Sequence, residues 1–446
     1  MSSEGEYEIS KNKHIPGSDT DSSDIFLFPY TIDEETINFI NEHGRIMFII
    51  RGPPGTAKDS LTNMLVDCYP KSQVFSADSY FSNTFSRGKR DRSTLIASHD
   101  FCQKKVASAC VKGVHPIIVK NTHMKIAEVQ KYVNFAAEYN YTVIMAITTR
   151  KMKVTPEILA QSNTKGLDVE YFRSRLKQWE EVIPVNTGWF LNSDDSSYLI
   201  NKLQTHIDYL LGDGKFCRVF DVDDEGQVLR SFSARKLLYC IAACGSNNQN
   251  HEISSYYLSE EVKEQYGQCF PIVIQGYLVT KFCIAAVVYL NETMKSLHFI
   301  KKNLFECNNY HEDISNLLHS VSLNGNFKKY TSTFDFRDID FTSSKKTSKE
   351  DGSKKYDNIL VNSCSFIILA ERKNEGKPKP HLFPAKFSIL FSELLNKVAD
   401  ENGIISMDTF SELEDGYKCF RLSDDSWIIR PPTNLIFKSV FTGLYI

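Results

Sequence analysis

The sequence predicts an α/β fold with a doubly wound, mostly parallel sheet, followed by a second half of α+β type. Apolar, strand-like runs alternate with helical segments up to residue 148, and a glycine-rich turn ending in a lysine follows the first run. Such alternation is typical of parallel sheets with helices on both faces. After residue 215 the segments become β-rich, which predicts the α+β half.

The first half contains four expected strands with helices between them. Thr31 or Asp33 is a suitable N-cap for a first helix, which runs through Asn41. The strands are expected at 45–51, 73–77, 116–119 and 141–148, and the later helices at 59–68, 94–112, 125–139, 169–182 and 198–211. Gly212 and Gly214 then mark a domain boundary.

Residues 47–60, MFIIRGPPGTAKDS, resemble a phosphate-binding loop of the pattern G-x-x-x-x-G-K-[ST]. In that pattern backbone N–H groups wrap the phosphates, the lysine reaches their outer oxygens, and the last hydroxyl holds Mg²⁺. The expected ligand is ATP or GTP with Mg²⁺. The candidate binding residues are Gly52, Gly55, Thr56, Lys58 and Asp59.

Two positions of this loop depart from the pattern. Ala57 stands where the last glycine is expected and adds a methyl group where the backbone approaches phosphate. Asp59 stands where the Mg²⁺-binding hydroxyl is expected, and its negative charge repels phosphate unless Mg²⁺ intervenes. A carboxylate can itself coordinate Mg²⁺, so Asp59 is also a candidate metal ligand.

Two further polar elements follow later strands. Asp78, in VFSADSYF, lies at the end of the second strand, where polynucleotide-kinase-like P-loop proteins carry a carboxylate that accepts the proton of a 5′-hydroxyl. The alternative is that Asp78 is only the N-cap of the turn that follows it. Asn121, Thr122 and His123 end the third strand and are expected at the same carboxyl edge, where such sheets bind ligands.

Composition limits the classes of partner and the cellular compartment. The net charge of −3 and pI near 6.4 give no global basic field for a nucleic-acid polymer. Eleven cysteines without paired C-x-x-C clusters, behind an acidic N-terminus without a signal peptide, favour a reducing, cytoplasmic location. The most hydrophobic window, 271–290, is interrupted by Gln275 and Lys281 and is interpreted as two strands, not a membrane span.

The second half has several expected strands and one polar tract. The strands are expected at 236–243, 272–279, 284–289, 366–370 and 427–429. Residues 342–356, TSSKKTSKEDGSKKY, are expected to form a mobile loop. Its five lysines are interpreted as a solvated run and not as a nucleic-acid patch.

Several segments together resemble the 2′,3′-cyclic-nucleotide 3′-phosphodiesterase (CNPase) family. They are RGPPGTAK, FSADSYF, NTH, AAEYNYTVIM and NTGWFL in the first half, and YLVTKF and KSVFTGLY in the second. The resemblance implies a P-loop polynucleotide-kinase-like domain and a two-histidine-phosphodiesterase-like domain. The expected division is a disordered tail at 1–24, a kinase-like domain at 25–213 and a phosphodiesterase-like domain at 214–446.

The family's reaction, hydrolysis of 2′,3′-cyclic phosphates to 2′-phosphates without a cofactor, uses two H-x-T motifs on neighbouring strands. By segment matching the catalytic positions fall on Tyr239 and Ile241 in KLLYCIAAC, and on Phe366 and Ile368 in SFIILA. No histidine in the chain is followed two residues later by Thr or Ser. Phenylalanine and isoleucine transfer no protons, and tyrosine, with a reference pKa of about 10, is poorly matched to acid–base work at neutral pH.

Alternatives remain for these positions. Tyr239 is a candidate hydrogen-bond donor to phosphate, whereas apolar runs of this length are typical of buried strands. His298 and His381 are interpreted as packed or exposed residues, and Cys240 with Cys244 is a weak signal for zinc. The chain ends in GLYI, without the terminal cysteine box that anchors vertebrate relatives, so no membrane anchor is expected.

Three functional hypotheses follow. The first is a pseudoenzyme that binds a nucleotide, an RNA end or a protein partner such as a cytoskeletal component, as the resemblance implies. The second is an enzyme with residual phosphodiesterase activity, or a divergent ATP-dependent kinase using Lys58 and Asp78. The third is a scaffold that binds no nucleotide.

Overall fold

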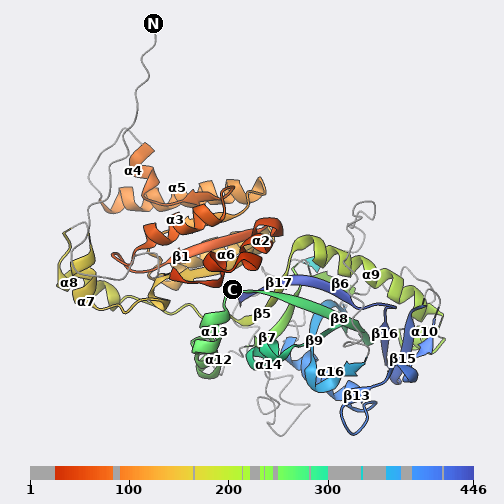
Figure 1. The fold of residues 1–446 in the computed structure, drawn as a ribbon. Coiled ribbons are helices and arrows are strands. Elements are labelled where there is room, and N and C mark those ends of the chain that lie inside the picture. The colour runs from red at the N-terminus through yellow and green to blue at the C-terminus, as the bar shows by residue number, and fades with distance from the viewer. Residues whose placement is uncertain are drawn as a thin grey trace, which may run out of the picture.

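The structure, a computed structural model, contains a four-stranded parallel sheet and a large antiparallel sheet, drawn mainly in red to yellow and in green to blue, respectively, in Figure 1. It describes residues 26–83, 91–163, 166–212, 214–220, 232–235, 237–244, 250–280, 283–299, 333–334, 358–372, 384–413 and 416–445. The expected tail at 1–24, the loop at 342–356 and His381 lie outside these ranges.

The parallel sheet confirms the four strands expected in the first half. It has the order β2-β3-β1-β4, with all three pairings parallel. The strands are β1 (Ile46–Arg51), β2 (Gln73–Phe75), β3 (Ile117–Lys120) and β4 (Thr142–Ile147). β1 and β4 are buried along their whole length, as expected for near-continuous apolar runs in a parallel sheet.

Helices precede, connect and follow the strands of the parallel sheet. They are α1 (Pro29–Ile32), α2 (Glu34–His43), α3 (Lys58–Cys68), α4 (Ser79–Asn83), α5 (Arg92–Val111), α6 (Ile126–Glu138), α7 (Pro156–Ser162) and α8 (Val169–Leu176), with a 3₁₀ turn, η2, at Thr148–Arg150. The Thr36 N–H donates to Asp33 Oδ2 at 2.8 Å, so Asp33 is the N-cap of α2. α3, α5 and α6 all pack against strands of this sheet.

One expected helix is shorter than the sequence predicted. The helix expected at 169–182 ends at Leu176. Beyond it the backbone oxygen of Glu180 accepts a hydrogen bond from the buried guanidinium of Arg51, which also lies over the Trp179 ring. These tertiary contacts hold the chain outside the helix as it approaches Pro184, whose ring disfavours helical geometry in the residue before it.

The antiparallel sheet has eleven strands, and the five strands expected in the second half all lie in it. Its strands are β5 (Asn186–Leu191), β6 (Phe232–Arg235), β7 (Tyr239–Cys244), β8 (Cys269–Thr280), β9 (Cys283–Tyr289), β10 (Thr333–Phe334), β12 (Cys364–Arg372), β14 (Ser411–Glu412), β15 (Lys418–Ser423), β16 (Ser426–Arg430) and β17 (Leu435–Leu444). β11 (Ile359–Leu360) and β13 (Ile404–Ile405) form a separate pair. The helices of this half are α9 (Ser193–Leu211), α10 (Gly214–Phe220), α12 (Asn250–Tyr257), α13 (Glu260–Gln265), α14 (Glu292–Leu297) and α16 (Pro384–Asn396).

Strand β5 joins the antiparallel sheet although it precedes residue 213, where the sequence predicts the domain boundary. It pairs with β17 on one side and with β7 on the other. Because β9 pairs with both β12 and β8, the strands β5, β7, β8, β9, β12 and β17 close into a ring. The division of the chain at residue 213 stays a prediction.

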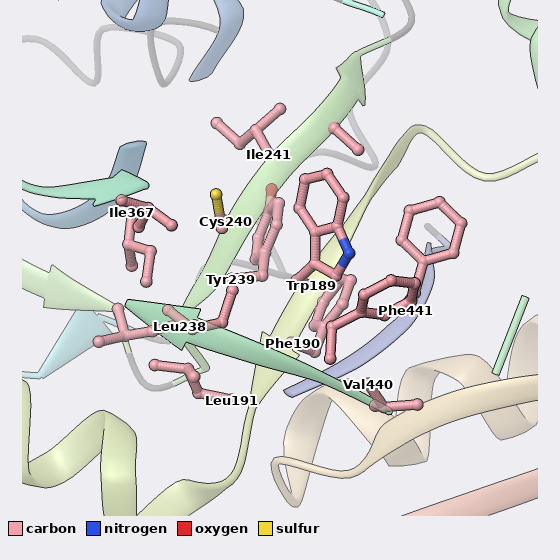
Figure 2. Packing of buried hydrophobic residues seen from close by; sticks show 14 of the residues in the cluster. Trp189, Phe190, Leu191, Leu238, Tyr239, Cys240, Ile241, Ile367, Val440 and Phe441 are labelled. Carbon is pink, nitrogen blue, oxygen red and sulfur yellow. The ribbon is translucent and has the colours of Figure 1, made fainter. Parts of the chain in front are cut away.

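Aromatic side chains pack between several strands of this ring. The ring centroids of Trp189 on β5 and Phe441 on β17 are 5.4 Å apart, and Trp189 also meets Phe270 of β8 edge-on at 6.3 Å. Figure 2 shows Trp189 beside Phe441, with Cys240 and Ile367 in the same buried cluster. This packing joins β17, the last strand, to β5, the strand that follows the parallel-sheet half.

Polar contacts also join the parallel-sheet half to the second half of the chain. The Tyr266 hydroxyl accepts from the Met145 N–H of β4 at 3.0 Å, and the Thr442 hydroxyl of β17 donates to the Val143 carbonyl at 2.7 Å. The Arg150 guanidinium lies 4.8 Å from the Tyr266 ring centroid. Within the described ranges, no helix is both long and apolar enough to cross a membrane.

Candidate functional site

The glycine-rich loop connects β1 to α3 and is fixed by the neighbouring strand ends. The Gly52 N–H donates to the Thr122 carbonyl at 3.1 Å. A Cβ at Gly52 would overlap the side chains of Thr148 and Thr56, so this position requires glycine. The Thr56 hydroxyl donates to the Pro53 carbonyl and accepts from Thr148, each at 2.8 Å. Thr56 is therefore committed to holding the loop in shape.

The Lys58 ammonium lies against this loop. Lys58 begins α3, and its Nζ donates to the carbonyl oxygens of Gly52 at 3.0 Å and Pro53 at 2.8 Å. A phosphate entering the loop would meet this ammonium together with the N–H groups at the start of an eleven-residue helix. To bind phosphate oxygens, Lys58 has to exchange its carbonyl partners for them.

Two residues of the loop have left-handed backbone geometry. Gly55 has φ +82° and Ala57 has φ 49°. Glycine adopts this region freely, whereas a residue with a Cβ loses roughly 1–2 kcal/mol there. The departure at Ala57 therefore preserves the backbone path that the missing glycine would adopt, at a cost in strain.

Asp59 carries a partner that the sequence did not reveal. Its Oδ1 lies 2.5 Å from the Nζ of Lys120, the last residue of β3. The Lys120 side chain is 25% exposed and that of Asp59 is 86% exposed. The carboxylate next to the glycine-rich loop is thus paired with an ammonium group of its own chain.

Asp78 lies near the same carboxyl edge, in the turn between β2 and α4. The expected strand 73–77 ends at Phe75, and the Asp78 N–H donates to Ser76 Oγ at 3.1 Å. The neighbouring Ala77 N–H donates to Asn121 Oδ1 at 2.9 Å, which joins this turn to the end of β3. Asp78 itself is exposed. β3 lies between β1 and β2, so Asn121 lies between the strand ends that lead to Lys58 and Asp78.

His123 is not an open ligand of this edge, contrary to the sequence-based expectation. It is buried, with φ 49°, and its ring meets the Tyr132 ring edge-on at 5.3 Å. Burial, and then the nearby charge of Arg51, lowers the pKa of His123 to about 3. The imidazole is therefore neutral at physiological pH and acts as a packing residue.

No sequence motif singled out Arg51, which holds the backbone at this edge of the sheet through buried hydrogen bonds. Arg51 is fully buried; its Nε donates to the His123 carbonyl at 2.6 Å and its Nη2 to the Met124 carbonyl at 3.0 Å. Its guanidinium carbon lies 3.8 Å from the Trp179 ring centroid, and Nη2 also donates to Glu180. Burial lowers its pKa to about 10, so it stays charged. The only signal was an arginine ending an otherwise apolar strand.

The four positions matched to the H-x-T motifs lie on adjacent strands and on one face. Cys240 of β7 pairs in register with Ile367 of β12. Side chains alternate along a strand, so the residues flanking these two share the opposite face of the sheet. They are Tyr239 and Ile241 on β7, and Phe366 and Ile368 on β12.

This shared face is filled at all four positions. The side chains of Tyr239, Ile241, Phe366 and Ile368 are 6%, 1%, 0% and 3% exposed, respectively. The Phe366 ring packs against Phe391 of α16, with centroids 5.1 Å apart. None of these four side chains is open to water or to a phosphate.

Tyr239 has a protein partner for its hydroxyl. Its oxygen accepts from Asn186 Nδ2 at 2.9 Å, and its ring stacks on Phe190 at 4.5 Å. Gly188 lies beneath the Tyr239 ring, and a Cβ there would overlap the Cys240 carbonyl. The glycine of the NTGWFL segment is thus required by the close approach of β7.

Burial limits the chemistry of the two remaining candidates from the sequence, His298 and Cys240. Burial lowers the pKa of His298 to about 4, so it is neutral at physiological pH. Burial also raises the pKa of Cys240 to about 12, which keeps it a thiol. In the part of the chain that the structure describes, no group of three or more His, Cys, Asp or Glu side chains is arranged to hold a metal ion.

Comparisons with known proteins place these features in a family context. No family model matches the chain. The chain is 24% identical to 2′,3′-cyclic-nucleotide 3′-phosphodiesterase of Rattus norvegicus over 276 residues, and 23% identical to that of Mus musculus, covering 59% of this chain and 64% of each relative. It therefore spans less than two thirds of these relatives. NEDD4-binding protein 2 of Homo sapiens is 27% identical over 144 residues, which is 32% of this chain and 8% of that protein.

Solved structures give a weaker likeness. A chain of the Pnkp1/Rnl/Hen1 RNA repair complex matches 30% of this chain and 43% of its own length, at 13% identity and a TM-score of 0.26. The curated relatives, taken together with the glycine-rich loop and the paired strands described above, support a family relationship. The chain is similar to the CNPase family over about 60% of its length.

Proposed function

We propose that this protein is a CNPase-like binding module that holds a nucleotide or the phosphorylated end of an RNA at the glycine-rich loop, without hydrolysing cyclic phosphates. The contrast between its two candidate sites supports the proposal. The loop has a lysine at the start of α3. All four positions matched to the H-x-T motifs are buried, and their residues either transfer protons poorly at neutral pH, as tyrosine does, or cannot transfer protons, as phenylalanine and isoleucine cannot.

Binding would use the backbone and one ammonium group. The N–H groups at the start of α3 and the Lys58 ammonium would contact the phosphate chain, while Thr56 and Thr148 keep the loop in shape. The nucleoside or RNA portion would lie along the carboxyl edge, near Asn121 and Asp78. A protein partner, such as a cytoskeletal component, remains part of this proposal because the family resemblance implies one.

The exposure of Asp78 favours one alternative, a divergent ATP-dependent polynucleotide-kinase-like activity. Asp78 is open to solvent beside the edge that carries Lys58, as a base for a 5′-hydroxyl has to be. In this alternative Lys58→Ala and Asp78→Asn both lower a rate of phosphate transfer. In the binding proposal Lys58→Ala lowers only an affinity.

The first experiment measures hydrolysis of 2′,3′-cyclic AMP by the purified full chain. We expect no turnover above the uncatalysed rate. The companion variant carries Tyr239→His, Ile241→Thr, Phe366→His and Ile368→Thr, and any gain of activity in it would show that these positions define the lost site. Turnover by the wild-type protein would overturn the proposal, whether or not the variant folds.

The second experiment measures thermal stabilisation by ATP for the wild type and for Lys58→Ala. A ligand at a hundred times its dissociation constant stabilises the folded state by about 2.7 kcal/mol. We expect such a shift for the wild type and a much smaller one for Lys58→Ala. An absent wild-type shift with ATP, GTP and a 5′-phosphorylated RNA would favour the scaffold hypothesis instead.

A further inference from the structure

We propose that the glycine-rich loop binds a phosphate chain without a divalent metal ion, and that the Lys120 ammonium, held by Asp59, supplies the positive charge that the metal supplies in related loops. The inference rests on the proposed function, because it concerns the same loop. It assigns a role to Lys120, which no motif of the sequence singled out.

The position of Lys120 in the fold supports this role. Lys120 ends β3, and its Cα is paired in register with Ile50 of β1, two residues before Gly52. Lys120 therefore lies at the end of the strand adjacent to β1, the strand that leads into the loop. The 2.5 Å contact with Asp59 Oδ1 holds the Lys120 ammonium at the first turn of α3, the helix that Lys58 begins.

Mg²⁺ does not fit the residues at this position. Mg²⁺ requires near-octahedral oxygen coordination, and in the related loops it is held by a neutral hydroxyl and a phosphate. Here the hydroxyl is replaced by Asp59, whose carboxylate is bound to an ammonium group. A metal ion would have to displace Lys120 or lie beside its positive charge.

The same pair removes the electrostatic objection to phosphate binding. An isolated carboxylate at the position of Asp59 would repel a phosphate chain. The Asp59–Lys120 pair has no net charge, and the ammonium has three N–H donors, of which the carboxylate uses only some. With Lys58, the loop then presents two ammonium groups to the phosphate oxygens.

The decisive experiment titrates the full chain with ATP by isothermal titration calorimetry, once with excess EDTA and once with Mg²⁺. We expect dissociation constants that agree within about threefold. Binding that is at least tenfold tighter with Mg²⁺ would overturn this inference and leave the proposed function standing. Absence of binding in both conditions would overturn both.

Two variants locate the effect on Lys120. In Lys120→Met the Asp59–Lys120 pair is removed, so we expect binding in EDTA to weaken at least tenfold and Mg²⁺ to restore part of it. In Asp59→Ser, the hydroxyl of related loops returns, and we expect binding to become stronger with Mg²⁺ than without it. Unchanged affinity of Lys120→Met in EDTA would contradict the inference.

The matched control is Lys104→Met, which removes one exposed ammonium from α5. It should bind ATP in EDTA as the wild type does, because long-range charge is screened over about 10 Å at 0.1 M salt. Unfolding of all three variants is followed by thermal denaturation. A lowered affinity then reports on the loop only for a variant whose unfolding midpoint matches that of the wild type.

Discussion

The glycine-rich loop and the paired strands β7 and β12 both depart from the patterns G-x-x-x-x-G-K-[ST] and H-x-T to which they are matched, but with different consequences. The loop is built largely from backbone groups, and Ala57 adopts the left-handed geometry of the missing glycine. β7 and β12 pair at Cys240 and Ile367, and the chemistry of an H-x-T site resides in side chains, whereas the side chains at the matched positions are buried on one face. A site made of backbone survives substitution better than a site made of side chains.

The largest effect is expected from a substitution of Arg51, which holds the backbone next to the glycine-rich loop. Arg51→Met leaves the carbonyl oxygens of His123, Met124 and Glu180 without their buried donor. Because each unsatisfied buried group costs about 1–3 kcal/mol, we expect the free energy of unfolding to fall by roughly 3–5 kcal/mol in urea denaturation. Arg173→Ala, an exposed arginine on α8, should change it by less than about 0.5 kcal/mol. Equal effects of the two variants would refute this role for Arg51.

The free energy of unfolding should also depend on pH through His123, which lies at the edge of the sheet that carries the glycine-rich loop. Its pKa is about 3 in the folded chain and 6.5 in the reference state, so between these values the unfolded chain binds a proton that the folded chain does not. Stability is therefore complete above about pH 6.5 and falls as the pH decreases toward 3, by up to about 1.4 kcal/mol per pH unit. His123→Asn, which tolerates the left-handed backbone, should show a shallower slope across this window in denaturation experiments. Parallel slopes for the two proteins would contradict the prediction.

On the strand side, Gly188→Ala should be the most damaging small substitution. The added Cβ would overlap the Cys240 carbonyl, a backbone atom that cannot move away by rotation. Overpacking of this kind costs about 1–3 kcal/mol, measured as a lowered urea midpoint. Gly214→Ala, at the start of α10 where an added Cβ meets nothing within 4 Å, is the matched control and should leave the midpoint unchanged or slightly raised.

Tyr239→Phe tests whether the Tyr239 hydroxyl stabilises the fold or binds phosphate. The substitution leaves the buried Asn186 amide without its partner, so we expect a loss of about 1–2 kcal/mol in stability and no change in ATP affinity. Stability is measured by urea denaturation and affinity by calorimetry. A lowered affinity with unchanged stability would instead place a ligand at the strand pair, so that the two regions would not differ in this way.

The smallest effect is expected at Ala57. Ala57→Gly relieves left-handed strain of roughly 1–2 kcal/mol, but glycine loses more backbone entropy on folding, so the net gain should be less than about 1 kcal/mol. Thermal denaturation measures it. A destabilised Ala57→Gly would show that the methyl group contributes packing that outweighs the strain.

Much of the fold was predictable because its signals are local. The apolar runs of β1, β3 and β4, the cap at Asp33 and the glycine-rich turn each depend on a few neighbouring residues. Two errors came from contacts made across the chain. The helix expected at 169–182 ends early because Arg51 holds Glu180, and β5 was not assigned as a strand because its partners, β7 and β17, lie far along the sequence.

The sequence by itself determined which groups are present: a lysine at the end of a glycine-rich turn, an aspartate in the place of a hydroxyl, and no histidine or threonine at the matched strand positions. Only the tertiary structure decided what those groups do. Lys120 meets Asp59 because β3 lies next to β1, and Tyr239 is satisfied by Asn186 because β5 lies next to β7. The physical reason is that charge pairing and burial depend on distances in space, which the folded chain sets between residues far apart in sequence.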